Sequence, residues 1–168
     1  MAEEIINRVK ASNLVVFDLE ELYPKGERVL FDLKPLLFQE LVLKEKDFRD
    51  FVRSHDWSQY RDKHVAIVCS ADAIVPTWAF MLVSISLQPY ATSIIFGNLD
   101  ELENYLFEKA ISKIEIEKFR NAKVIVKGCS KIDVPLNAYV RIAELLRPIV
   151  SSIMFGEPCS TVPLYKSK

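Results

Sequence analysis

The sequence contains one module twice, and this repeat constrains the fold more than any other feature. Residues 75–97 and 134–156 align without a gap and are identical at nine of 23 positions, where unrelated segments would match at roughly one or two. The identical pairs are Val75/Val134, Pro76/Pro135, Ala79/Ala138, Leu87/Leu146, Pro89/Pro148, Ser93/Ser152, Ile94/Ile153, Phe96/Phe155 and Gly97/Gly156. A Cys-Ser pair precedes each copy, and the signature recurs as Cys159-Ser160-Thr161-Val162-Pro163. The repeat indicates an internal duplication.

Each copy has the pattern of a strand, a Cys-Ser loop, a helix and a second strand. The predicted elements are strands at His64–Val68, Lys123–Lys127, Ala91–Phe96 and Val150–Phe155, and helices at Val75–Leu87 and Leu136–Leu146. Such alternation is typical of parallel sheets with right-handed crossovers. We therefore expect an α/β fold with a mainly parallel sheet and flanking helices, built on a duplication over 64–97 and 123–156. With 168 residues, one α/β domain over 1–168 is expected.

Other segments are predicted from shorter patterns. Glu3–Lys10 is expected to form a short helix, and the β-branched run Leu14–Asp18 a strand. Lys46–His55 has one apolar stripe and a charged face, which predicts an amphipathic helix. Asn98 and Glu101 resemble a capping box that opens another helix. The tail after Gly156 has no clear secondary structure.

The first repeat helix, Val75–Leu87, is apolar nearly all round. Such a helix is expected to be buried on most sides, and its exposure in a monomer would suggest a homodimer. Pro76 and Pro89 leave too few residues between them to span a bilayer, so we expect no membrane segment.

Composition excludes several functional classes. The net charge of −1 gives no electrostatic surface for nucleic acid or an acidic membrane. The first ten residues, MAEEIINRVK, lack the basic and apolar regions of a secretory signal. The chain has three cysteines, which is an odd number, and no C-x-x-C motif. Reduced thiols and a cytoplasmic location are therefore expected.

The cysteines are the best candidates for a functional site. Cys69 and Cys129 each follow a predicted strand and precede a helix, and Cys159 follows the strand Val150–Phe155. Because ligands of parallel sheets bind at the carboxyl ends of the strands, all three are expected on one edge of the sheet. Three thiols suit zinc or an iron–sulfur cluster. A fourth position could be filled by Asp72, Asp133, Glu157, water or a partner, and Asp72 is the better candidate because Asp133 is expected to cap a helix.

Two alternatives remain open. One cysteine could serve a thiol-dependent enzyme in sulfur transfer or redox chemistry, or the cysteines could be packing residues of a structural or partner-binding module. Ser70, Ser130 and Ser160 are expected to hydrogen-bond the loop backbone or a bound ligand. No catalytic residue is assigned, because the two histidines, His55 and His64, are poorly placed for a Ser-His-Asp triad. No phosphate-binding glycine motif is present.

Two long segments resemble a known family. They are FQELVLKEKDFRDFVRSHDWSQYRDKHVAIVCSADAIVPTWAFMLV and the later MFGEPCSTVPLYK, and they are similar to the bacterial domain-of-unknown-function family 2480. The resemblance covers nearly the whole chain and implies a cytoplasmic protein whose family has no catalytic residues to transfer. It also implies a gene that lies near the genes for iron–sulfur cluster assembly of the sulfur-mobilisation type. The proteins of that assembly system are then the expected partners.

Overall fold

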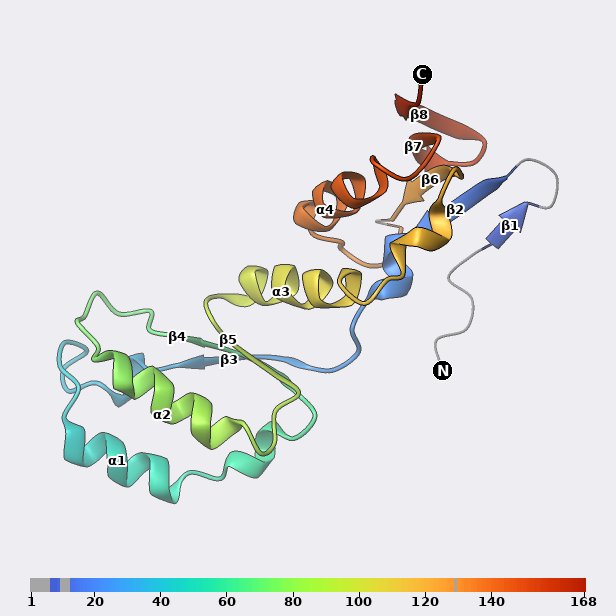
Figure 1. Ribbon diagram of the computed structural model, residues 1–168. Coiled ribbons are helices and arrows are strands. Elements are labelled where there is room, and N and C mark those ends of the chain that lie inside the picture. Colours follow the sequence, from blue (N-terminus) through green and yellow to red (C-terminus); the bar gives the residue numbers. More distant parts are fainter. Residues whose placement is uncertain (1–6, 10–12, 129) are drawn as a thin grey trace. The chain divides into compact units, whose positions relative to one another are not determined.

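The structure is a computed structural model that describes residues 7–9, 13–128 and 130–168 (Figure 1). The chain divides into two compact units, which we describe separately. Unit 1 comprises Met1–Pro24 and Asn104–Lys168, and unit 2 comprises Lys25–Glu103. Unit 2 is thus inserted into the sequence of unit 1. The expectation of one α/β domain stays a prediction.

Unit 2 is built on a three-stranded parallel sheet in the order β3-β4-β5. Its elements are β3 (Arg28–Asp32), η2 (Lys34–Leu36), α1 (Glu45–Ser54), η3 (Trp57–Tyr60), β4 (His64–Val68), α2 (Thr77–Leu87) and β5 (Ser93–Phe96). The sequence predicted β4, β5 and both helices but not β3. The strands bury Phe31, Val65 and Ile67 against apolar residues of α1 and α2.

Helix α2 buries one stripe, formed by Ala79, Val83 and Leu87 at a spacing of four residues. On its other side Met81 and Ile85 are 58% and 67% exposed. The expectation that this helix is buried on most sides is therefore wrong. The sequence could not predict which side of the helix is buried, because a helix without a polar face shows no amphipathic pattern.

Unit 1 is built on a five-stranded sheet in the order β1-β2-β6-β7-β8. Its strands are β1 (Asn7–Val9), β2 (Leu14–Asp18), β6 (Lys123–Lys127), β7 (Ser152–Glu157) and β8 (Ser160–Lys166). The central strands β2, β6 and β7 are parallel, and β1 and β8 pair antiparallel at the two edges. The remaining elements are η1 (Leu19–Leu22), η4 (Ile116–Phe119), α4 (Leu136–Leu146) and α3 (Leu99–Ile111), which begins in unit 2.

The structure confirms the α/β class and corrects several details. Over the described residues it has four α-helices and two mainly parallel sheets, where the sequence predicted one sheet. Asn7–Val9 is a strand paired with β2, not part of a helix, and the rest of the predicted helix Glu3–Lys10 lies outside the described residues. The tail forms the edge strand β8 instead of lacking structure. No helix in the described part of the chain is long and apolar enough to cross a membrane.

Candidate functional sites at the carboxyl ends of the strands

The same three residues stand at the end of the first parallel strand in each unit. Strand β2 ends in Phe17-Asp18 and is followed by Leu19, and β3 ends in Phe31-Asp32 and is followed by Leu33. The phenylalanine and leucine are buried in both units. Each aspartate accepts a hydrogen bond from the backbone N–H two residues later, of Glu20 at 3.0 Å and of Lys34 at 2.9 Å. Our sequence analysis missed this motif, although the repeated pattern V-x-F-D-L at 15–19 and 29–33 was a signal for it.

In unit 2, Asp32 holds the Cys-Ser loop that follows the neighbouring strand β4. The Ser70 backbone N–H donates to Asp32 Oδ1 at 3.0 Å, and the Ser70 hydroxyl donates to Asp32 Oδ2 at 2.5 Å. Burial alone would raise the pKa of Asp32, but the hydrogen bonds from Ser70 and Lys34 bring that pKa below its ordinary value. The Ser70 hydroxyl therefore binds a side chain of β3, whereas its predicted role with the loop backbone or a ligand stays a prediction.

Cys69 directly follows β4, as the sequence predicted. It is half-buried, packs against the core of unit 2, and its thiol donates to the carbonyl of Ala71 at 3.8 Å. Asp72 is exposed in the same loop. The surroundings of Cys69 are thus those of a packing residue with a local hydrogen bond.

In unit 1, Glu20 rather than Asp18 holds the Cys-Ser loop. Glu20 Oε1 accepts hydrogen bonds from the backbone N–H groups of Ser130 and of Lys131, the latter at 3.0 Å. These bonds, that of Lys131 first, lower the pKa of Glu20. An acidic side chain from the first strand or the turn after it therefore holds the Cys-Ser loop in both units.

Asp18 instead takes part in a charged cluster at the ends of β2, β6 and β7. Lys127 Nζ lies 3.3 Å from Asp18 Oδ2 and 3.6 Å from Glu157 Oε2. The hydrogen bond to Asp18 raises the pKa of Lys127, so the ammonium stays charged. The pKa of the nearby Glu21 is raised, first by burial and then by the negative charge of Asp18.

Cys159 lies at this same edge of unit 1. It is exposed in the two-residue turn Pro158-Cys159, which joins β7 to β8, and the strands on either side pair Glu157 with Ser160. Ser160 is also exposed. Cys129 follows the end of β6 by two positions in the sequence and lies outside the described residues.

The expectation that the cysteines share one sheet edge is wrong for Cys69 and Cys159, because β4 and β7 belong to different sheets. Within the described ranges, no group of three or more His, Cys, Asp or Glu residues could hold a metal ion. The assignment of Cys69, Cys129, Cys159 and Asp72 as ligands stays a prediction, as does ligand binding by Ser70, Ser130 and Ser160.

The two histidines are engaged elsewhere. His64 begins β4, at the opposite end of the strand from the Cys-Ser loop, and its Nε2 lies 2.8 Å from the carbonyl oxygen of Lys25. His55 Nε2 lies 3.2 Å from the hydroxyl of Tyr60, in an aromatic cluster with Phe31 and Trp57. Each imidazole thus contacts groups outside the Cys-Ser loops.

The protein is thus of the α/β class, with two mainly parallel sheets. In each sheet, an acidic residue at or just after the end of one strand binds the Cys-Ser loop that follows a neighbouring strand. The chain matches the DUF2480 family, described as a protein of unknown function, over residues 3–167. It belongs to this family, as the resemblance of its sequence implied. No curated protein and no solved structure matches the chain.

Proposed function

We propose that this protein is a cytoplasmic accessory factor in iron–sulfur cluster or metal handling, which uses the thiols at the carboxyl end of the unit 1 sheet. The observation that carries the proposal is the pairing of β6 with β7. These strands are parallel neighbours, and the last residue of β6, Lys127, is ion-paired with the last residue of β7, Glu157. Cys129 and Cys159 each follow one of these residues by two positions.

Two cysteines that follow neighbouring strands in the sequence suit a thiophilic metal ion better than an oxygen-preferring one. The carboxylates of Asp18 and Glu157 lie at the same edge and could add ligands. Two thiols alone leave coordination positions open. Open positions fit a factor that receives and passes on its cargo, because a partner protein can supply the missing ligands. Cys69 is not part of this site, since its strand belongs to the sheet of unit 2.

The test is the metal and acid-labile sulfide content of protein purified without oxygen, together with its visible absorption spectrum. We expect stoichiometric metal in the wild type and in Cys69→Ser, which is the matched control. We expect its loss in Cys129→Ser and in Cys159→Ser. Equal loss in Cys69→Ser would overturn the two-thiol site, and a colourless protein without metal would overturn metal handling altogether.

Sulfur transfer is the second candidate, and the exposure of Cys159 in the turn after β7 is the observation that favours it. An exposed thiol is accessible to the sulfur of a partner protein. The Cys159 thiolate would attack the outer sulfur of a partner's persulfide. A new S–S bond then forms on Cys159, and the partner's cysteine leaves as a thiolate. Incubation with a small-molecule persulfide should add the mass of one sulfur atom to the wild type but not to Cys159→Ser.

A further inference from the structure

A small hollow lies on the unit 1 sheet, at the opposite end of β7 from Cys159. It has a volume of about 250 Å³, and its lining includes two lysines, a serine, a methionine and a proline: Lys123, Lys166, Ser152, Met154 and Pro163. These residues belong to β6, β7 and β8. Pockets for drug-sized ligands measure roughly 300–1,000 Å³, so this hollow suits a smaller molecule.

Strand register places a hydroxyl group between two ammonium groups in this hollow. Ser152 pairs with Lys123 in parallel register and with Lys166 in antiparallel register. Side chains that pair directly across neighbouring strands lie on the same face of a sheet. Since neighbouring strands are about 4.8 Å apart, the backbones of the two lysines are separated by roughly 10 Å. Their long side chains therefore allow both ammonium groups to contact one ligand above Ser152.

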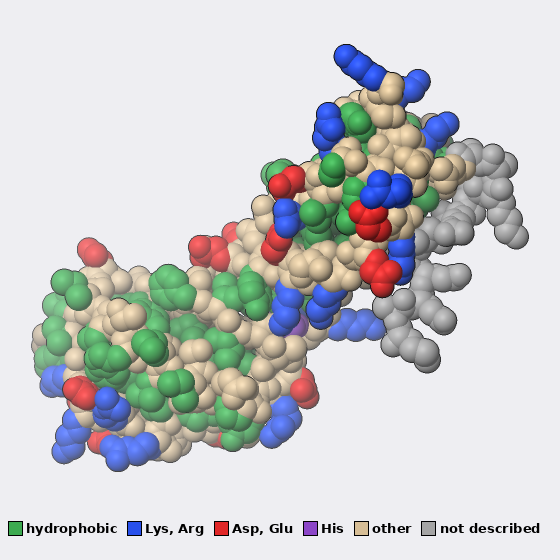
Figure 2. Space-filling model, viewed as in Figure 1, with side chains coloured by type: hydrophobic (Ala, Val, Ile, Leu, Met, Phe, Trp, Pro, Cys, Tyr) green, Lys and Arg blue, Asp and Glu red, His purple; other side chains and the backbone are tan. Residues whose placement is uncertain are grey.

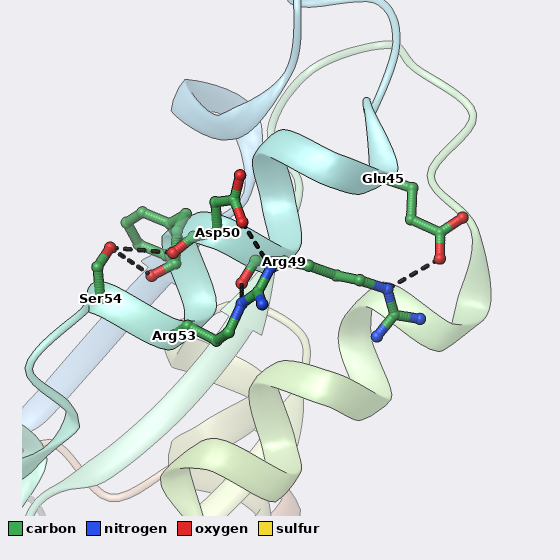
Figure 3. Close-up of polar contacts among 6 residues, drawn as sticks. Glu45, Arg49, Asp50, Arg53 and Ser54 are labelled. Carbon is green, nitrogen blue, oxygen red and sulfur yellow. Dashed lines mark hydrogen bonds and ion pairs between the residues drawn. The ribbon is translucent and has the colours of Figure 1, made fainter.

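Both lysines are exposed and available to an anion. Within the described part of the chain, neither is paired with a carboxylate. Helix α1 shows the contrast, because Arg49 pairs with Glu45 at 2.8 Å and Arg53 with Asp50 at 2.5 Å (Figure 3). Figure 2 shows Lys and Arg side chains gathered around the C-terminal end of the chain, which Figure 1 places after β8. This end of unit 1 is therefore suited to attract a negatively charged ligand.

Comparison with unit 2 shows that the fold does not require unpaired cations here. The corresponding row of that sheet consists of Arg28, His64 and Ser93. Arg28 is ion-paired with Glu103 at 2.5 Å, and His64 Nε2 lies 2.8 Å from the carbonyl oxygen of Lys25. The serine is identical in the two repeats, but it is buried in unit 2 and half-buried in unit 1. In unit 2, groups of the protein itself thus occupy the row that faces the hollow in unit 1.

We propose that this hollow binds a small organic phosphate monoester. Two ammonium groups match the charge of a phosphate monoester, about −1.5 to −2 at neutral pH, better than the single charge of a carboxylate. Lysine binds phosphate as a point charge, and the Ser152 hydroxyl can donate a further hydrogen bond. Met154 and Pro163 pair across β7 and β8 and form an apolar wall for the organic group. The site contains no cysteine and does not depend on the proposed function.

The test is a titration of the ¹⁵N-labelled full chain at neutral pH and constant ionic strength, followed by the NMR shifts of its backbone amides. The probes are phenyl phosphate, inorganic phosphate and benzoate. We expect phenyl phosphate to give saturable shifts below about 10 mM, centred on Ser152 and Lys166. Inorganic phosphate should bind at least ~3-fold more weakly because it has no apolar part. Benzoate should bind at least ~5-fold more weakly because it has a single charge.

Two variants remove one positive charge each and keep an apolar side chain of similar length. Lys123→Met and Lys166→Met should each weaken the binding of phenyl phosphate by at least ~5-fold. The matched control is Lys113→Met, which removes an exposed charge of unit 1 outside the hollow and should leave binding unchanged. Circular dichroism checks that each variant folds. Should Lys123→Met fail to fold, Lys166→Met at the end of the edge strand carries the test.

Three results would overturn the proposal. The first is the absence of saturable shifts at the hollow with phenyl phosphate. The second is an equal loss of binding in Lys113→Met, because the attraction would then depend only on the net charge of the protein. The third concerns the ligand class: benzoate binding as tightly as phenyl phosphate would contradict a phosphate site, and inorganic phosphate binding as tightly would contradict an organic ligand.

Discussion

Each unit holds its Cys-Ser loop with an acidic side chain, but the residue that does so differs between the two units. In unit 2 the aspartate that ends the first strand, Asp32, binds the Cys-Ser loop directly through Ser70. In unit 1 the corresponding Asp18 pairs with Lys127, and Glu20 from the following turn binds the loop. The shared element is an acidic group that holds the loop. Moving that task by two residues leaves Asp18 available for the charged cluster of unit 1.

The helices after the Cys-Ser loops differ in a similar way. Both bury a stripe at a spacing of four residues, but the opposite face is apolar in α2 and mixed in α4, where Arg141 and Glu144 lie beside the exposed Val140. The buried stripe is thus common to both helices, whereas their exposed faces differ.

The largest expected effect comes from the phenylalanines of the repeated Phe-Asp-Leu segment. Phe17 is fully buried and packs edge-on against Phe119, and Phe31 stacks on Trp57. Replacing either by alanine should cost about 3–5 kcal/mol of the free energy of unfolding, because it leaves a cavity. Hydrogen exchange should show lost protection in unit 1 for Phe17→Ala and in unit 2 for Phe31→Ala. Equal loss in both units for either variant would break the comparison.

A smaller effect should separate the two aspartates. Asp32→Ala removes three hydrogen bonds, one from Lys34 and two from Ser70, and should cost about 1.5–3 kcal/mol. Asp18→Ala removes one backbone hydrogen bond and an ion pair, and should cost about 1 kcal/mol. Urea unfolding measures both values. A larger cost for Asp18→Ala would contradict the assigned roles.

The contribution of Asp32 should also depend on pH. Its pKa is lowered in the folded protein, so the folded state holds this proton less tightly than the unfolded state does. The stability it adds is therefore fully present above the unfolded value of about 3.9 and is lost as the pH falls through the lower folded value. The free-energy difference between wild type and Asp32→Asn should be constant near neutral pH and shrink in acid. A difference that grows in acid would refute the carboxylate's role.

The smallest expected effects concern the exposed ion pairs of the helices. Arg49→Ala in α1 removes a pair with Glu45 whose two side chains are 49% and 63% exposed. It should change the free energy of unfolding of the monomer by about 0.5 kcal/mol or less. Arg141→Ala in α4, which has two partners, should cost slightly more. A cost above 1 kcal/mol for Arg49→Ala in thermal melts would indicate a packing role over Trp78, whose ring lies 5.1 Å away.

Much of the fold could be predicted from hydrophobic pattern. The repeat gave β4, β5, β6, β7, α2 and α4, and it placed Cys69 directly after β4 and Cys159 shortly after β7. Strand β3 was missed because its five residues, RVLFD, are short and charged at both ends. Strand β8 was missed because it contains Pro163, which an edge strand can accommodate since one side of it has no partner.

The division into two sheets could not be predicted, because strand pairing is a non-local property. Strand β2 pairs with β6 although the whole of unit 2 lies between them in the sequence. The sequence of neither strand identifies its pairing partner. The acidic groups that hold the loops were missed for the same reason: Asp32 and Ser70 are 38 positions apart. Exposure of α2 was also beyond prediction, because an entirely apolar helix does not reveal which stripe it buries.

The thiols of the two units should differ in accessibility, and their alkylation rates measure that difference. The folded protein would be treated with iodoacetamide under reducing conditions, and modification of each cysteine followed by peptide mass spectrometry. The exposed Cys159 should react quickly, and Cys69, packed against the unit 2 core, should react at least ~10-fold more slowly. A Cys69 that reacts as fast as Cys159 would contradict the account and return the functional thiol to unit 2.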